Sequence, residues 1–182
     1  LAAAVLQEGQ PWTGEAVVRA VRGLCGALLW AASATGLGSA LLGRGDRPVG
    51  VVAAGACGLG VLGLVLLPLV GLGLLGPVTL GIVLVAGLAA GARRPQLTLP
   101  ETSTVILLLL AVWAVPGLLD ALSPPVDTDE VYQHLALPKL MWESGGLVGG
   151  LLQPDGSRPL PVHMVWTGAW LVGGEAAPKL LH

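Results

Sequence analysis

The longest apolar run restricts this chain more than any other feature. Residues Val49 to Gly91 contain no Asp, Glu, Lys or Arg. A bilayer core about 30 Å thick needs only about 20 helical residues to cross it. The run is therefore long enough for two crossings, and we expect the break at Gly71-Leu72-Gly73, because glycine favours a turn. Pro77 then lies in the first turn of the second helix, where its missing N–H costs little.

The composition supports a membrane protein. The chain has 182 residues, of which 54% are hydrophobic and 11% charged, whereas soluble domains carry about 25% charged residues. The net charge of −2 gives no electrostatic argument for binding nucleic acid. Cys25 and Cys57 lie in apolar runs and lack the spacing of a metal pair or a disulfide framework.

We therefore predict an all-α fold, a polytopic transmembrane helical bundle of four to six spans. Residues 1–104 should hold about three spans. Residues 105–182 should hold a further span, an outer loop with an amphipathic helix, a short span and the start of the next helix. The chain begins at Leu1 and stops at His182 within a pattern, so we expect it to be part of a longer protein. The predicted spans are Gly23–Leu42, Val49–Val70, Leu74–Gly91, Val105–Leu122 and the short Leu160–Gly173.

An acidic stretch directly follows the fourth predicted span. Asp127, Asp129 and Glu130 place three carboxylates within four residues. Each ionised carboxylate would cost about 2.5–3.5 kcal/mol at mid-membrane. The stretch should therefore lie in an aqueous layer or in a polar cavity.

One interpretation of the acidic stretch is purely structural. Asp127 and Glu130 have the spacing of a capping box, and Asp129 would complement the helix dipole in the first turn. The helix that follows would be amphipathic and would lie on the membrane surface. Its apolar side chains would be Val131, Leu135, Leu140 and Trp142.

A functional interpretation is also open. A third carboxylate exceeds what a cap needs, and clustered carboxylates bind divalent cations such as Mg²⁺ or Mn²⁺. Glu130 and His134 would share a helix face, where they could act as base and orienting group or as metal ligands. Lys139, after the helix-ending Pro138, could meet a lipid phosphate, either nonspecifically or in a substrate. A single His beside a membrane is also often an ordinary hydrogen-bonding residue, and this holds for His134 and His163.

Basic residues are almost evenly divided between the two sides of the predicted topology. We expect the acidic stretch outside, because the compact Arg93-Arg94 turn would then be inside. The inside residues would be Arg44, Arg47, Arg93, Arg94 and Lys179; the outside residues would be Arg19, Arg22, Lys139 and Arg158.

The second half of the chain resembles a known family. The residues are Pro124-Pro125, Asp129 and His134-Leu135-Ala136-Leu137-Pro138-Lys139, followed by Gly173-Gly174-Glu175-Ala176-Ala177. This pattern resembles bacterial multi-spanning glycosyltransferases of the GT-C class, which are related to polyprenyl-phosphate-dependent mannosyl- and arabinosyltransferases. The resemblance covers Val105–His182; residues before it share only general character.

The resemblance implies a function and a location. Such enzymes sit in the bacterial cytoplasmic membrane with several spans and transfer a sugar from a polyprenyl-phosphate donor at its outer face. By position, Asp129 would be the general base or a metal ligand, with Glu130 next. Asp127-Thr128 departs from the usual pattern, so Asp127 and Asp129 both remain candidates. The part of the protein in this sequence should be inactive alone.

Two other classes of protein are also compatible with the sequence. The acidic stretch could bind a cation or proton in a transporter, or it could only cap a helix in a noncatalytic membrane protein. A transporter should carry ionisable groups near mid-membrane, and the first four predicted spans are nearly free of them.

Overall fold

The computed structural model describes residues 14–43, 48–93, 97–99, 104–122, 139, 143 and 160–181. Of these residues, 87% are helical, which agrees with the predicted helical fold. A single pair of two-residue strands accompanies the helices in the described part of the chain. The elements are α2 (Gly14–Leu42), β1 (Val49–Gly50), α3 (Val51–Gly71), α4 (Pro77–Ala92), β2 (Leu97–Thr98), α5 (Thr104–Leu122), α7 (Leu160–Gly173) and α8 (Ala176–Leu181).

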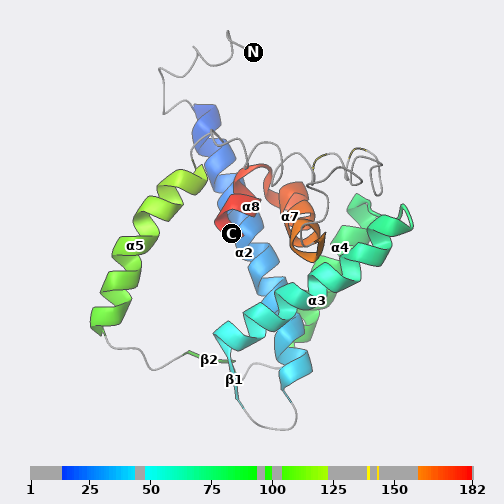
Figure 1. Cartoon of the computed structure of the whole chain (residues 1–182), viewed down its shortest axis with the longest axis horizontal. Helices are drawn as coiled ribbons and strands as arrows, with labels where there is room; N and C mark the ends of the chain where they lie inside the picture. The colour runs from blue at the N-terminus through cyan, green and yellow to red at the C-terminus, as the bar shows by residue number, and fades with distance from the viewer. Residues whose placement is uncertain are drawn as a thin grey trace.

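Helix α2 is the centre of the bundle. It packs against α3, α4, α7 and α8, whereas α5 stands apart from α3 and α4 (Figure 1). Large apolar side chains fill the space between the helices, and Trp30, Leu62, Leu66, Val70 and Met164 have no exposed surface. The core therefore lies around α2.

Small residues allow the helices to approach α2 closely. A side chain on Gly38 would overlap the backbone of Ala54 in α3, and one on Gly58 would overlap the backbone of Ala34 in α2. On another face of α2, side chains on Gly36 or Gly87 would collide with the facing helix. Helix packing through small residues is typical of membrane bundles, although it is not restricted to them.

The predicted break in the long apolar run is confirmed. Helix α3 ends at Gly71, and Gly73 has a φ of 68°, a left-handed conformation that glycine adopts without steric cost. The N–H of Leu74 donates to the carbonyl of Leu69 over 2.8 Å, and that of Gly73 to Val70 over 3.0 Å. These two bonds form a Schellman motif that closes α3. Pro77 is in the first turn of α4, as expected.

The strands mark one end of the bundle, here named the strand end. Val49 pairs with Leu97 and Gly50 with Thr98 in a parallel ladder. In the chain, β1 lies between α2 and α3, and β2 lies between α4 and α5. The end of α2 therefore lies against the start of α3 and the end of α4, and α5 starts toward the same end of the bundle but apart from these three helices (Figure 1). The opposite end, which holds the first turns of α2 and the last turn of α5, is named the far end (Figure 1).

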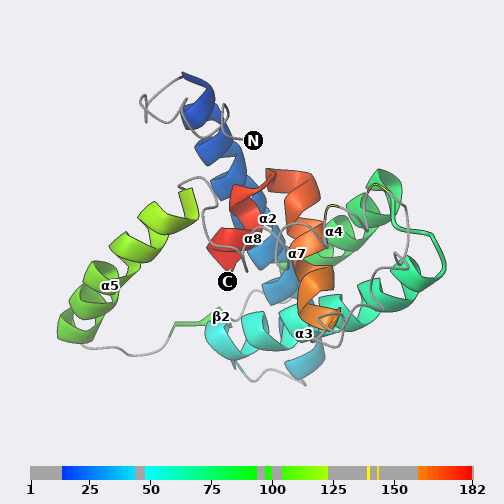
Figure 2. The ribbon, with the colours of Figure 1, turned by 45° about the horizontal axis from the view of Figure 1, so that its top comes forward.

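Helix α7 runs antiparallel to α2. The ring of Trp30 lies on Gly168, Gly26 lies against Gly173, and Gly23 lies against Ala176. Along α7 the chain therefore moves toward the start of α2, and Gly174, with a φ of 70°, turns it into α8. Figure 2, turned from the first view, shows α7 rising beside α2 in the same way.

This direction corrects the expected position of Lys179. The predicted fifth span would have carried Lys179 to the same side as the Arg93-Arg94 turn. The contacts of α7 and α8 with the first half of α2 instead put Lys179 at the far end, with Arg19. A helix of 14 residues such as α7 is also about 21 Å long, which is less than a bilayer core.

The number of spans stays a prediction. In the described part of the chain, α2 and α3 are long and apolar enough to cross a membrane, while α4 and α5 are apolar and shorter than α3. The predicted amphipathic helix after Asp127 lies outside the described residues, apart from Lys139 and Glu143, which are both helical.

Candidate functional site

Four of the five predicted site residues lie outside the described part of the chain. They are Asp127, Asp129, Glu130 and His134. The structure therefore does not test their roles as base, metal ligands or substrate contacts. Only Lys139 can be placed.

Lys139 is helical and exposed. Its Nζ lies 4.0 Å from Oε1 of Glu143, and the two side chains are 55% and 57% exposed. An exposed pair at this i, i+4 spacing contributes about 0.3–0.5 kcal/mol at most, and Lys before Glu is the less favourable order on a helix. The ammonium group is thus weakly held and accessible to an anionic ligand.

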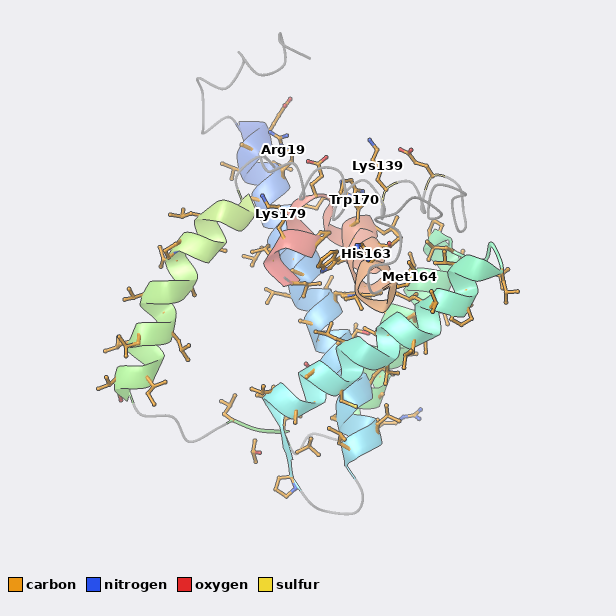
Figure 3. The ribbon with its side chains drawn as sticks, viewed as in Figure 1. Arg19, Lys139, His163, Met164, Trp170 and Lys179 are labelled. Atoms are coloured by element: carbon orange, nitrogen blue, oxygen red, sulfur yellow. The ribbon has the colours of Figure 1, made fainter. Side chains whose placement is uncertain are left out.

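Basic side chains occur at the end of the bundle toward which α5 runs. Figure 3 shows Arg19, Lys139 and Lys179 toward the far end of the bundle. Arg19 and Arg22 on α2 are exposed. Exposed cations gathered at one end raise the local concentration of anionic groups such as phosphates. The far end therefore combines basic side chains with the end of α5, which lies five residues before Asp127 in the sequence.

Within the described ranges, no group of three or more His, Cys, Asp or Glu side chains could hold a metal ion. Glu15 and Glu175 are exposed, and they belong to no such group. The divalent cation suggested for Asp129 and Glu130 stays a prediction.

Helix α7 carries buried polar side chains. His163 in its first turn is 3% exposed, and its ring meets the ring of Trp166 edge to face, with the centroids 5.2 Å apart. The hydroxyl of Thr167 donates to the carbonyl oxygen of His163 over 2.8 Å. The sequence suggested an ordinary hydrogen-bonding role for His163 near a membrane; the structure places it inside the bundle.

Two polar groups on α2 were not singled out from the sequence. Trp30 and Ser33 have no exposed surface, and neither Trp30 Nε1 nor Ser33 Oγ has a hydrogen-bond partner within the described residues. Ser33 lies against Gly87 of α4. Their three-residue spacing within an apolar run was the available signal, because residues three apart share a helix face.

An apolar cleft lies between α4 and α7. Its volume is about 220 Å³, and it is lined by Pro77, Leu80, Gly81, Leu84, Leu171 and Val172. These residues offer no charged side chain. The cleft can accept an apolar chain and offers nothing that would bind a phosphate or a sugar.

Comparisons with protein-family models, with curated proteins and with solved structures found no match for this chain. The GT-C resemblance therefore rests on the residues themselves.

Proposed function

We propose that the chain is part of an integral membrane glycosyltransferase that transfers a sugar from a polyprenyl-phosphate donor to an acceptor hydroxyl. The observation that carries the proposal is the stretch from Pro124 to Lys139, with its acids followed by His134-Leu135-Ala136-Leu137-Pro138-Lys139. The end of α5 and the basic side chains at the far end support it, since they suit a site that meets a lipid phosphate at a membrane surface.

The exposed apolar surface supports membrane embedding. Helix α5 exposes apolar side chains around its circumference, including Leu109 at 64% and Val112 at 71%. Soluble monomers rarely expose contiguous apolar patches larger than a few hundred Å². Helices α3 and α4 add Val52 at 71%, Leu64 at 64% and Val78 at 76%. A bilayer would cover these surfaces.

The proposed reaction needs a base and a neutralised leaving group. Asp129 would accept the proton of the acceptor hydroxyl as its oxygen bonds to the anomeric carbon of the sugar. The bond from that carbon to the phosphate oxygen would break, and polyprenyl phosphate would leave. Lys139 and the basic residues of the far end would interact with its charge, while Glu130, Asp127 or His134 would orient the groups or hold a divalent cation.

The outer location of the site rests on the resemblance. With Lys179 moved to the far end, the residues on the acidic side become Arg19, Arg22, Lys139, Arg158 and Lys179, against Arg44, Arg47, Arg93 and Arg94 on the other side. A count of five against four does not orient the protein under the positive-inside rule. The Arg93-Arg94 turn no longer decides the orientation.

The test is Asp129→Asn in the full-length protein. We expect transfer of labelled sugar from a polyprenyl-phosphate donor to fall by about 10²–10⁴-fold, the usual contribution of a general base. Membrane insertion should be unchanged. Glu175→Gln, an exposed acid of the far end, is the matched control and should retain activity.

Retained transfer in Asp129→Asn would remove this residue from the mechanism, and Asp127→Asn would then be the decisive variant. If both variants and Glu130→Gln remain active, the acidic stretch acts only as a helix cap. The transporter alternative is disfavoured, because α3 and α4 carry no charged side chain, whereas transporters place ionisable groups along their path.

A further inference from the structure

The directions of α5 and α7 place the two ends of the intervening chain on the same side of the bundle. Helix α5 starts shortly after β2 at the strand end, and its 19 residues are about 28 Å long. Its last turn lies toward the start of α2 in both ribbon views (Figures 1 and 2). Leu122 is therefore at the far end.

Helices α7 and α8 return to that same end. The pairs Trp30 with Gly168, Gly26 with Gly173 and Gly23 with Ala176 define an antiparallel register along α2. Helix α7 thus starts within the bundle, beside α3 and α2, and finishes at the far end. Leu122 and Gly173 are therefore on the same side of the bundle.

We propose that α7 is one limb of a re-entrant segment: it starts at membrane depth inside the bundle and leaves the bilayer on the side where α5 ends. This inference rests on the membrane embedding in the proposed function, and it is independent of the sugar-transfer chemistry. Glu175 and Lys179 then face the same aqueous compartment as Arg19 and Arg22.

The burial pattern of α7 fits a re-entrant limb. Backbone that starts at membrane depth is tolerated where protein surrounds it. Every side chain from His163 to Ala169 is buried, and Met164 and Thr167 have no exposed surface. By contrast, all the described side chains of α5 are exposed. Helix α7 is thus enclosed by protein, whereas α5 has the surface of a lipid-facing span.

Single cysteines test the arrangement in the full-length protein. In a background with Cys25→Ala and Cys57→Ala, cysteine replaces one of three exposed residues: Arg22 at the far end, Arg93 at the strand end or Glu175 after α7. Right-side-out and inside-out vesicles are treated with a membrane-impermeant maleimide. Glu175→Cys should react in the same vesicles as Arg22→Cys, and Arg93→Cys only in the opposite preparation.

If Glu175→Cys reacts in the same vesicles as Arg93→Cys, α7 crosses the bilayer. This result would overturn the re-entrant segment and leave the membrane embedding standing. Release of the protein from membranes by alkaline carbonate would instead overturn the membrane embedding, and this inference with it. Loss of sugar transfer in any of these cysteine variants would bear only on the proposed chemistry.

A second measurement tests the register without vesicles. The double variant Gly23→Cys with Ala176→Cys should form a disulfide on oxidation, since a Cβ at Gly23 would meet that of Ala176 and a small separation of the two helices brings the pair to disulfide geometry. The pair Leu41→Cys with Ala176→Cys is the matched control and should not, because Leu41 is exposed near the strand end of α2, eighteen residues from Gly23. Cross-linking of the control pair, with none in the first, would contradict the antiparallel register.

Discussion

Glycines on α2 and its neighbours have different roles depending on what faces them. Gly58 of α3 lies against the backbone of Ala34, whereas Gly60, two residues later on the same helix, has no atom within 4 Å of where a Cβ would be. Both belong to the same Gly-Leu-Gly triplet. The close approach of α2 to α3 therefore depends on the first glycine and not on the second.

Alanine at these two positions should have opposite effects. Gly60→Ala should stabilise α3 by up to about 1 kcal/mol, the difference in helix propensity. Gly58→Ala should destabilise the bundle by about 1–3 kcal/mol, because overpacking forces the helices apart. Thermal unfolding in detergent, followed by circular dichroism, measures both, and equal shifts in the two variants would contradict the packing.

Two serines of α2 provide a second contrast. Ser39 Oγ donates to the carbonyl of Gly36 over 2.8 Å, whereas Ser33 Oγ is buried without a partner in the described residues. Burying an unpaired hydroxyl is unfavourable, and losing a hydrogen bond costs about 0.5–1.5 kcal/mol. Ser39→Ala should lower the free energy of unfolding, while Ser33→Ala should leave it unchanged or raise it. A loss of stability in Ser33→Ala equal to that in Ser39→Ala would show that Ser33 has a partner.

At the scale of elements, the α3–α4 hairpin depends on its closing glycine. Gly73 has a φ of 68° and donates the bond that ends α3, whereas Gly76 has a φ of −152° and precedes α4. The two glycines are three residues apart in one turn. Only the first requires a left-handed conformation.

Gly73→Ala should destabilise the hairpin by about 1–2 kcal/mol, the cost of the left-handed conformation for an L-residue. Gly76→Ala should cost less, about 0.5–1 kcal/mol, because its extended conformation is open to alanine and only the poorer N-cap preference of alanine counts against it. Chemical unfolding of the two variants in detergent measures both losses of stability. A similar cost for both variants would mean that the turn does not have this geometry.

At the scale of the whole molecule, the described helices expose an extensive apolar surface. Large apolar side chains are exposed on α2, α3, α4 and α5, and the two longest apolar helices suit a bilayer. We expect the protein to stay with membranes during alkaline carbonate extraction and to need detergent to remain monodisperse. Size-exclusion chromatography above and below the critical micelle concentration would measure this. A monodisperse species without detergent would overturn the membrane proposal.

The local features were predictable because their causes are local. The hairpin break at Gly71-Leu72-Gly73, the position of Pro77 and the short helix Leu160–Gly173 follow from glycine and proline chemistry and from the lengths of apolar runs. Hydrophobicity alone also indicated the helical class. The acidic stretch was equally visible, but its roles as cap, metal site or base depend on neighbours that no local pattern specifies.

The sequence by itself determined which segments are helices and where most of them end, because propensity, capping and turn chemistry act over a few residues. Only the tertiary structure decided that α7 runs back toward the start of α2, which moved Lys179 to the far end and removed the charge argument for orientation. The physical reason is packing: Gly23, Gly26 and Gly168 are small residues like many others in the chain. Their function in helix packing appears only when Ala176, Gly173 and Trp30 are placed against them.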